Sequence, residues 1–214
     1  MRFTSGPGRR PDPSAARETY RNRAGRYDLE LAAFEPLREK AIALLAPVAG
    51  DTVVDIGCGT GLSFPPLLER IGPTGRIVGV DPSPEMLELA RGRVASHGWS
   101  NVAVLQATAA EAPLQGHADA ALFHFTHDVI REPASLDNVL GHLKHGARVV
   151  ASGLQWAPSW MLPTNLFVLG AALYSTSTLD GLDEPWTLLA RRLKSFRVEN
   201  FSWAGMYIAT GLVG

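Results

Sequence analysis

The chain has 214 residues, of which 46% are apolar and 19% are charged, and 20 basic residues nearly balance 21 acidic ones. This length and apolar content fit one globular domain with an appendage and exclude a wholly disordered or fibrous protein. The near-neutral charge argues against a nucleic-acid partner, because phosphate binding ordinarily needs a basic excess.

The amino-terminal stretch departs from this balance. Residues 1–26 carry seven arginines and two acids, a net charge of +5. A charged stretch of this kind usually forms a solvated arm. The elements expected before the main domain are an irregular stretch over residues 1–13 and helices over residues 14–23 and 32–46.

Cysteine usage and apolar runs indicate the compartment. Cys58 is the only cysteine, so no intrachain disulfide and no cluster of zinc-binding thiolates can form. The amino terminus lacks the apolar stretch of a signal peptide, and the most apolar segment, Met161–Tyr174, is shorter than a membrane span. We therefore expect a cytoplasmic protein with no integral membrane association.

From residue 52 onward, short β-branched runs alternate with helical stretches, which is typical of βαβ units and a parallel sheet. The expected strands are residues 53–56, 76–80, 102–106, 119–123 and 147–152. The expected helices are residues 62–71, 83–98 and 132–146, the last with His142, Lys144 and His145 in its final turn.

The carboxyl-terminal third breaks this rhythm. The elements expected there are helices near residues 163–174 and 185–194 and strands over residues 196–203 and 206–213. Ala204 and Gly205 form a short turn, so the last two strands should pair antiparallel as a hairpin.

The most informative motif is VVDIGCGTG, residues 53–61, which leaves a buried strand and enters a helix. Its three glycines let the backbone turn sharply and approach a ligand closely. Asp55 can accept hydrogen bonds from the loop amides. Asp81 ends the next strand, twenty residues after Gly61, where a carboxylate reaches the ribose hydroxyls of a nucleoside ligand.

The glycine spacing separates two kinds of cofactor. A dinucleotide fold requires G-x-G-x-x-G, but Leu62 occupies the sixth position here. The observed pattern is D-x-G-x-G-x-G, followed by VDPSPEML over residues 80–87. Over roughly residues 48–152 the sequence resembles the class I S-adenosylmethionine-dependent methyltransferases.

The resemblance implies a Rossmann-like α/β fold: a doubly wound, seven-stranded, mostly parallel sheet whose last strand is antiparallel. It also implies S-adenosyl-L-methionine as cofactor and S-adenosyl-L-homocysteine as product. No metal is expected, because no clustered carboxylates or thiols complete a site with the pairs His124/His127 and His142/His145. The glycines line the methionine moiety, Asp81 bonds the ribose and Met86 packs on adenine. The implied cofactor-binding residues are Asp55, Gly57, Cys58, Gly59, Gly61, Asp81, Pro82, Met86, Thr108, Ala109, Phe123 and His124.

One position departs from the family pattern. Such enzymes commonly carry an Asp after the third strand, near the adenine amino group, whereas Thr108 stands at that place here. Thr108 can still form a hydrogen bond, with help from the backbone of Ala109. Glu111 is an alternative partner, or an exposed residue of the first turn of a helix.

The end of the fourth strand supplies the candidates for chemistry. Methyl transfer from a sulfonium needs positioning and exclusion of water, and it needs a base only for a poorly nucleophilic acceptor. His127 is the preferred base and His124 the second catalytic candidate, since histidine can take a proton near neutral pH. Alternatively, His124 packs beside the methionine tail and His127 caps the next helix.

Aromatic residues outside the sheet core are the candidates for binding an acceptor. The expected substrate-binding residues are Tyr20, Tyr27, His127, Trp156, Trp160 and Tyr207. Such side chains suit an apolar or aromatic molecule, although they could equally cover the sheet edge or form a dimer contact. We expect residues 1–47 to be an arm with helices that cover the active site. Residues 48–214 then form the cofactor-binding domain, with a lid insert at about 154–186.

These features predict a methyltransferase that acts on an O, N or C atom of a small, largely apolar or aromatic molecule, with a homodimer left open. A lipid or quinone head group is an alternative acceptor. The competing classes are a nicotinamide oxidoreductase, a non-catalytic cofactor-binding module, and an enzyme that uses the same cofactor for a non-methylating reaction such as cyclisation.

Overall fold

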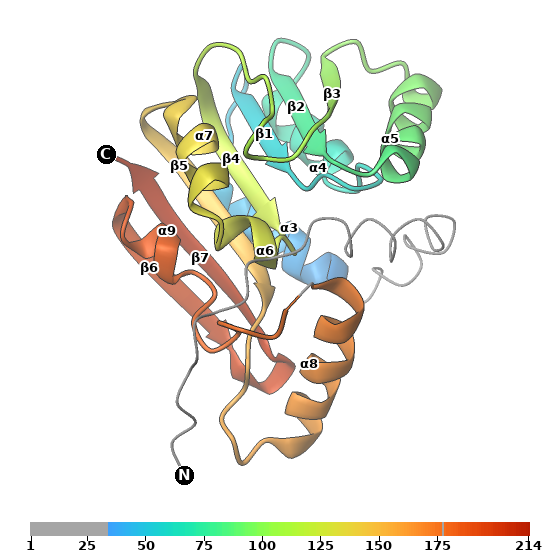
Figure 1. The fold of residues 1–214 in the computed structure, drawn as a ribbon. Coiled ribbons are helices and arrows are strands. Elements are labelled where there is room, and N and C mark those ends of the chain that lie inside the picture. The colour runs from blue at the N-terminus through green and yellow to red at the C-terminus, as the bar shows by residue number, and fades with distance from the viewer. Residues whose placement is uncertain (1–33, 177) are drawn as a thin grey trace.

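The structure is a computed structural model that describes residues 34–176 and 178–214. Its centre is a seven-stranded sheet with the strand order β3-β2-β1-β4-β5-β7-β6 (Figure 1). The strands are β1 (Thr52–Ile56), β2 (Arg76–Asp81), β3 (Val102–Gln106), β4 (Ala118–His124), β5 (Leu143–Leu154), β6 (Leu193–Phe201) and β7 (Met206–Val213). Strands β1 to β5 pair in parallel, and β7 runs antiparallel to both β5 and β6. The expected fold class is confirmed.

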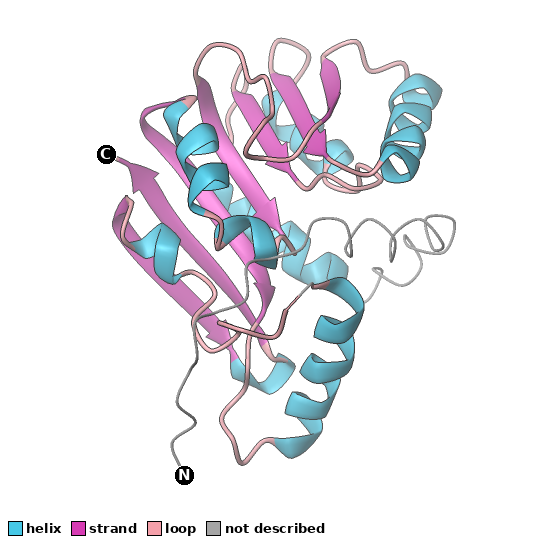
Figure 2. Ribbon diagram, viewed as in Figure 1, coloured by secondary structure: helices cyan, strands magenta, loops and turns pink. Residues whose placement is uncertain are grey.

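Helices cover both faces of the sheet (Figure 2). The helices are α3 (Glu35–Leu45), α4 (Phe64–Ile71), α5 (Pro84–His97), α6 (His127–Ile130), α7 (Pro133–Gly141), α8 (Leu162–Ser175) and α9 (Thr187–Ala190). Apolar side chains of α3, α4 and α5 pack on one face, and those of α6, α7 and α9 pack on the other. Because neighbouring strand residues point to opposite faces, Val53 belongs to the first core and Val54 to the second.

The start of α5 shows how the local sequence fixes an element. Ser83 is the N-cap, and its hydroxyl accepts a hydrogen bond from the amide of Met86 at 3.3 Å. Pro84 follows at the first helical position, and Gly98 ends the helix in the left-handed conformation. The predicted helix over residues 83–98 is thus confirmed, cap residues included.

Two predicted helices are too long. The helix expected over residues 132–146 ends at Gly141, and β5 begins at Leu143, which pairs with Ala118 of β4. Lys144 and His145 therefore lie in a strand and not in a final helical turn. The helix expected over 185–194 is only α9, because β6 begins at Leu193. In both places pairing with a distant strand overrides a local helical pattern.

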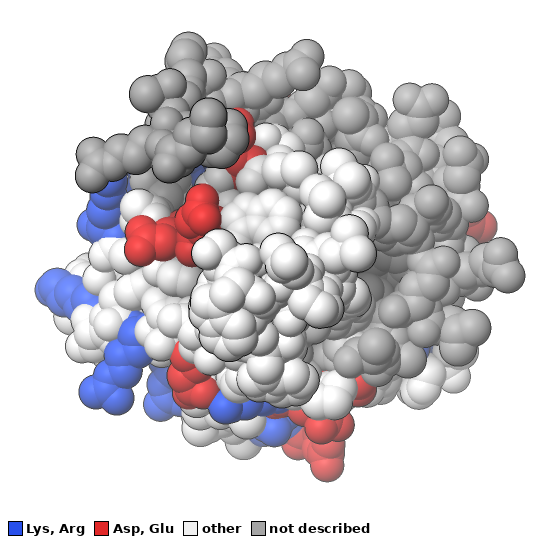
Figure 3. Space-filling model, turned by 90° about the horizontal axis from the view of Figure 1, so that it is seen from below, with Lys and Arg blue, Asp and Glu red and all other residues white. Residues whose placement is uncertain are grey.

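Helix α8 and the short 3-10 helix η2 (Ser202–Ala204) lie beyond the ends of β5, β6 and β7. The inner side of α8 packs through Val168 and Ala172 onto Leu154 and Leu182. Seen from below, the middle of the described surface is white, and most of the visible Lys, Arg, Asp and Glu side chains lie towards its left and lower sides (Figure 3). Within the described part of the chain, no helix is both long and apolar enough to cross a membrane.

Candidate active site at the carboxyl edge of the sheet

The glycine loop between β1 and α4 lies at the carboxyl edge of the parallel strands. Gly57, Gly59 and Gly61 have φ angles of 67°, 54° and 78°, in the region that side chains disfavour. A Cβ atom on Gly57 would come within 2.4 Å of the side chain of Thr126. The loop therefore needs glycine here both for its conformation and for its close approach to the end of β4.

Asp81 at the end of β2 holds this loop. One carboxylate oxygen accepts a hydrogen bond from the Gly59 amide at 3.0 Å, and the other accepts one from the Ser83 amide at 2.9 Å. Burial raises the pKa of Asp81 to about 6, although these two hydrogen bonds oppose the rise. The carboxylate predicted to reach a ribose is thus fixed in orientation beside the glycine loop.

Asp55 does not hold the loop as expected. The amides of Gly57 and Cys58 donate instead to the carbonyl of Val80, at 2.7 and 3.1 Å, and Gly59 donates to Asp81. Asp55 is buried within β1, and its Oδ2 atom has no hydrogen-bond partner among the described residues. Burial raises the pKa of Asp55 to about 7, against the opposing charge of the Arg38 guanidinium.

Arg38 of α3 is a site residue that the sequence reasoning missed. Its side chain is buried and forms an ion pair with Glu35, but its Nε atom has no partner in the described structure. Its charge acts on both Asp55 and His124 and lowers the pKa of each. The sequence did contain a sign that Arg38 is buried, because its helical spacing places it on the same face of α3 as the apolar residues Ala41, Ile42 and Leu45.

His124, the last residue of β4, lies next to β5. Its Nδ1 atom forms a hydrogen bond with the hydroxyl of Ser152 at 2.7 Å, and its Nε2 atom is buried without a partner. Burial and the nearby Arg38 lower the pKa of His124 to about 3. The ring is therefore neutral at physiological pH, so it can exchange hydrogen bonds there but is a weak proton acceptor.

His127, the first residue of α6, contacts the segment that follows α8. Its Nε2 atom lies 3.0 Å from the carbonyl oxygen of Asp180. The same Nε2 atom lies 3.2 Å from Nη1 of Arg131, which can only donate, so the carbonyl and the guanidinium call for opposite tautomers. The Nδ1 atom is buried and has no partner among the described residues. Burial and the adjacent Arg131 lower the pKa of His127 below its usual value.

Buried polar atoms without partners gather at this edge of the sheet. Native proteins rarely leave such atoms unpaired, because each one loses its hydrogen bonds to water without replacement. Among the described residues they include Arg38 Nε, Asp55 Oδ2, His124 Nε2, Thr126 Oγ1 and His127 Nδ1. They occupy neighbouring ends of β1 and β4 and the helix packed beside them. Such a cluster is typical of a ligand-binding site, where the ligand supplies the missing hydrogen-bond partners.

An aromatic cluster borders the same site. The ring of Phe125 lies 4.7 Å from that of His124 and 4.9 Å from that of Phe34, which in turn lies 6.3 Å from Phe167 of α8. Phe125 has a φ of 57°, an unusual conformation for a residue with a large side chain. The backbone is strained where β4 meets the site. The sequence had pointed to Phe167 as a residue of the acceptor pocket, but not to Phe34 or Phe125.

The other predicted cofactor-binding residues flank the glycine loop. Met86 and Phe123 are buried, as is Cys58, whose thiol pKa is raised by burial. Pro82 is half-buried between Asp81 and the N-cap of α5.

The predicted adenine-binding segment follows β3. The Thr108 hydroxyl donates to Glu111 at 3.0 Å, and Glu111 is exposed. The carbonyl of the buried Ala109 accepts a hydrogen bond from Asn138 of α7 at 2.9 Å. Both residues of the predicted pair therefore already have internal partners.

The predicted acceptor residues are not all brought together. Tyr207 is buried, and its ring lies 4.8 Å from that of Trp186. It pairs with Gly153 of β5, and a Cβ atom on Gly153 would contact both the Tyr207 ring and the backbone of Phe125, so Tyr207 lies close to the end of β4. Trp156 is half-buried beneath α8. Trp160, in contrast, is 77% exposed and belongs to the outer surface, not to the site. Tyr20 and Tyr27 lie outside the described residues.

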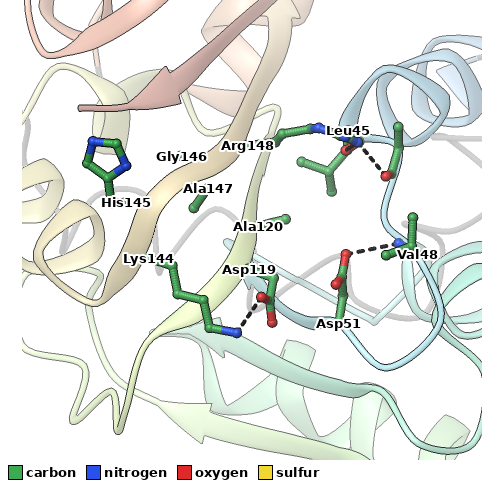
Figure 4. Close-up of a pocket in the computed structure, with 11 residues that line it drawn as sticks. Leu45, Val48, Asp51, Asp119, Ala120, Lys144, His145, Gly146, Ala147 and Arg148 are labelled. Carbon is green, nitrogen blue, oxygen red and sulfur yellow. Dashed lines mark hydrogen bonds and ion pairs between the residues drawn. The ribbon is translucent and has the colours of Figure 1, made fainter.

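The opposite, amino edge of the sheet carries a pocket of about 240 Å³ in which charged groups are paired (Figure 4). Lys144 forms an ion pair with Asp119, which also accepts a hydrogen bond from the Thr52 amide at 2.9 Å. Arg148 donates to the carbonyl of Ala46 at 2.6 Å, and Asp51 accepts from the Val48 amide at 2.9 Å. These contacts join β4, β5 and the end of α3 and so have a structural explanation.

No group of three or more His, Cys, Asp or Glu side chains that could hold a metal ion is found in the described ranges.

Comparison with known proteins shows which proteins the chain is similar to. Residues 53–146 match the family model described as a methyltransferase domain. The aklanonic acid methyltransferase DauC of Streptomyces sp. (strain C5) is 35% identical over 72 residues, 34% of this chain and 33% of that protein. The demethylmenaquinone methyltransferase of Lactococcus lactis is 30% identical over 118 residues, 53% of this chain and 46% of that protein. The chain therefore matches less than half the length of either relative.

A solved structure extends the likeness over nearly the whole fold. The N-methyltransferase NodS of Bradyrhizobium japonicum WM9, in complex with S-adenosyl-L-homocysteine, has a TM-score of 0.67 at 14% identity, covering 92% of this chain and 98% of that one. The strand order with an antiparallel β7 and the glycine loop define the class I methyltransferase fold. The fold is therefore that of the class I S-adenosylmethionine-dependent methyltransferases, and residues 53–146 carry the match to the methyltransferase-domain model.

Proposed function

We propose that this protein transfers the methyl group of S-adenosyl-L-methionine to an O, N or C atom of a small, largely apolar or aromatic molecule. The observation that carries the proposal is the cluster of buried, unpartnered polar atoms beside a glycine loop, at the carboxyl edge where such folds bind nucleosides. When bound, the cofactor supplies an activated methyl group.

The residues of this edge fit the cofactor's chemistry. The Asp81 carboxylate faces the ribose hydroxyls, and the three glycines leave room for the methionine moiety. The guanidinium of Arg38 suits the cofactor's carboxylate, because that carboxylate would accept a hydrogen bond from the unpartnered Nε atom. Asp55 suits the cofactor's ammonium group, because that group would donate to the unpartnered Oδ2 atom. These assignments are part of the proposal.

The acceptor side is proposed to use His127 and the aromatic cluster. We assign His127 as the base in the tautomer whose Nε2–H donates to the Asp180 carbonyl, so that its Nδ1 takes the acceptor's proton. His124 is a poorer base because its pKa is about 3, so we assign it to orienting the reactants through hydrogen bonds. Phe34, Phe125 and Tyr207 offer apolar faces and exclude water.

A second candidate acceptor is a lipid or quinone head group. One observation favours it: α8, beside the site, exposes several large apolar side chains. The name of the Lactococcus lactis relative, a demethylmenaquinone methyltransferase, is consistent with such an acceptor.

Calorimetric titration of the full chain with S-adenosyl-L-homocysteine tests cofactor binding, with NAD as the control ligand. We expect saturable binding of the first and none of the second. Binding of NAD alone would contradict the proposal and indicate an oxidoreductase. Transfer of label from methyl-labelled cofactor to aromatic phenols, amines or quinols then tests catalysis. Cofactor binding with no transfer to any acceptor class would indicate a non-catalytic module. Consumption of the cofactor without transfer of its labelled methyl group would indicate a different reaction.

A further inference from the structure

A second pocket lies beyond the end of β5, beside the first turn of α8. Its volume is about 570 Å³, which is within the range of small-molecule sites. The main walls are residues 155–159 after β5, the residues just before α9, and the end of β6 with the first residue of η2. Its lining includes none of the residues whose unpartnered atoms define the proposed active site. The proposed reaction therefore does not explain this pocket.

Hydrogen bonds fix the loop that forms one wall of this pocket. The Trp156 amide donates to the carbonyl of Leu182 at 2.8 Å, which joins the loop to the segment before α9. Asn165 of α8 accepts a hydrogen bond from the Ala157 amide at 2.9 Å and donates to the Ala157 carbonyl at 3.2 Å. The walls are thus held together by contacts between distant segments, so the pocket is formed before anything binds.

Gln155 presents a buried amide to the pocket. The residue is only 4% exposed and lines the pocket, yet its side chain forms no hydrogen bond with any described residue. Burying an amide without a partner is costly, because the hydrogen bonds that it made to water are not replaced. A ligand with an N–H donor would supply the partner that the amide oxygen lacks.

The other side chains of the pocket favour a cation. Asp183 and Glu184 line it, and neither carboxylate forms an ion pair within the described structure. Its described lining contains no Lys, Arg or His, so the two acids give the pocket a negative potential. The half-buried Trp156 and Trp186 also line it, and the face of an indole ring attracts a cation.

We propose that this pocket binds a small apolar or aromatic molecule that carries a primary ammonium group. The ammonium group donates to the Gln155 amide oxygen and lies near the carboxylates of Asp183 and Glu184, while the apolar part packs on the tryptophan faces. A metal ion fits less well, because the described residues hold no group of three His, Cys, Asp or Glu ligands. This inference does not rest on the proposed function, since binding of an amine can be measured without cofactor.

Calorimetric titration of the full chain with benzylamine tests the proposal. Benzyl alcohol is the matched control ligand, because it has the same ring and nearly the same size but no charge. We expect benzylamine to bind, with an affinity that falls as salt is added, and benzyl alcohol to bind roughly tenfold more weakly or not at all.

Two variants locate the site. Asp183→Asn/Glu184→Gln should weaken benzylamine binding roughly 3- to 10-fold, because both carboxylates are exposed and partly screened by water. Gln155→Leu should weaken it about tenfold or more, since it removes a hydrogen bond to a charged group. The Tm of Gln155→Leu without ligand should not fall, because the amide has no described partner to lose.

The matched control variant is Glu69→Gln/Glu88→Gln, which neutralises two exposed acids on α4 and α5. It should bind benzylamine like the unchanged protein. Absence of benzylamine binding, equal affinities for the amine and the alcohol, or pocket variants that bind as before would each overturn the proposal. A lower Tm of Gln155→Leu with unchanged affinity would also overturn it, by showing that the amide serves the fold and not a ligand.

Discussion

The two edges of the central sheet both carry charged side chains, but they differ in whether these side chains have hydrogen-bond or ion-pair partners. At the amino edge, Asp119, Lys144 and Arg148 all have partners from neighbouring elements. At the carboxyl edge, Asp55 and Arg38 are buried and His124 is half-buried, and each keeps a buried polar atom without a partner among the described residues. The first arrangement stabilises the fold by itself, whereas the second is complete only when something else binds. The comparison shows that charged residues at a sheet edge do not by themselves indicate a binding site. Buried polar atoms without hydrogen-bond partners do.

The largest effect is expected at His127. The variant His127→Ala should reduce kcat about 100- to 10,000-fold, because the transition state loses its proton acceptor, while the affinity for S-adenosyl-L-homocysteine stays nearly unchanged. The acid limb of the pH–rate profile, which lies below the usual histidine range because the pKa of His127 is lowered, should disappear. His145→Ala at the amino edge is the control and should keep full turnover. An unchanged rate in the His127 variant would exclude it as the base.

Asp81 should give the next largest effect. Asp81→Ala should weaken cofactor binding by roughly 10- to 150-fold, or about 1.5–3 kcal/mol, since it removes a charged acceptor from the ribose and from the loop amides. Calorimetric titration measures the change in Kd. Asp119→Ala, an acid on the opposite edge, should bind the cofactor as before. Equal affinities of the two variants would refute the assignment of Asp81 to the ribose.

Asp55 should make stability depend on pH. Its pKa is raised from 3.8 to about 7, so between these values the folded protein holds a proton that the unfolded chain has released. The free energy of unfolding therefore falls as the pH rises through this window. Asp81 acts in the same direction up to about pH 6, whereas the lowered pKa values of His124 and His127 act in the opposite direction below about 6.5.

The variant Asp55→Asn isolates one contribution from this sum. Its Tm, relative to that of the unchanged protein without cofactor, should rise between about pH 4 and about pH 7, because the amide has no charge to bury. Thermal unfolding at several pH values measures this difference. A difference in Tm that stays constant across the range would contradict the raised pKa.

The smallest effect is expected at the paired edge. Lys144→Met breaks the ion pair with Asp119, but the lysine is exposed, so the loss of stability should stay within about 1 kcal/mol and shrink at high salt. Cofactor affinity should not change. Denaturant unfolding and calorimetry check the two statements. A large loss of cofactor affinity would show that the two edges are not independent.

Local sequence determined much of the fold and the cofactor half of the site. The alternation of β-branched runs with helical stretches predicted the sheet, and β3 and β7 were placed with the bounds that the structure has. Ser83, Pro84 and Gly98 marked the ends of α5. The glycines of the loop were found because a left-handed backbone conformation leaves few other residue types.

Tertiary structure decided the rest. The start of β5 at Leu143 depends on pairing with β4, and a helical pattern in the local sequence gave no sign of it. Arg38 joins the site because α3 packs against β4, which carries His124 and pairs with the strand of Asp55. His127 meets Asp180 more than fifty residues later in the chain. Periodicity and capping report interactions within one element, whereas the burial and partners of a charged side chain depend on which distant elements pack around it.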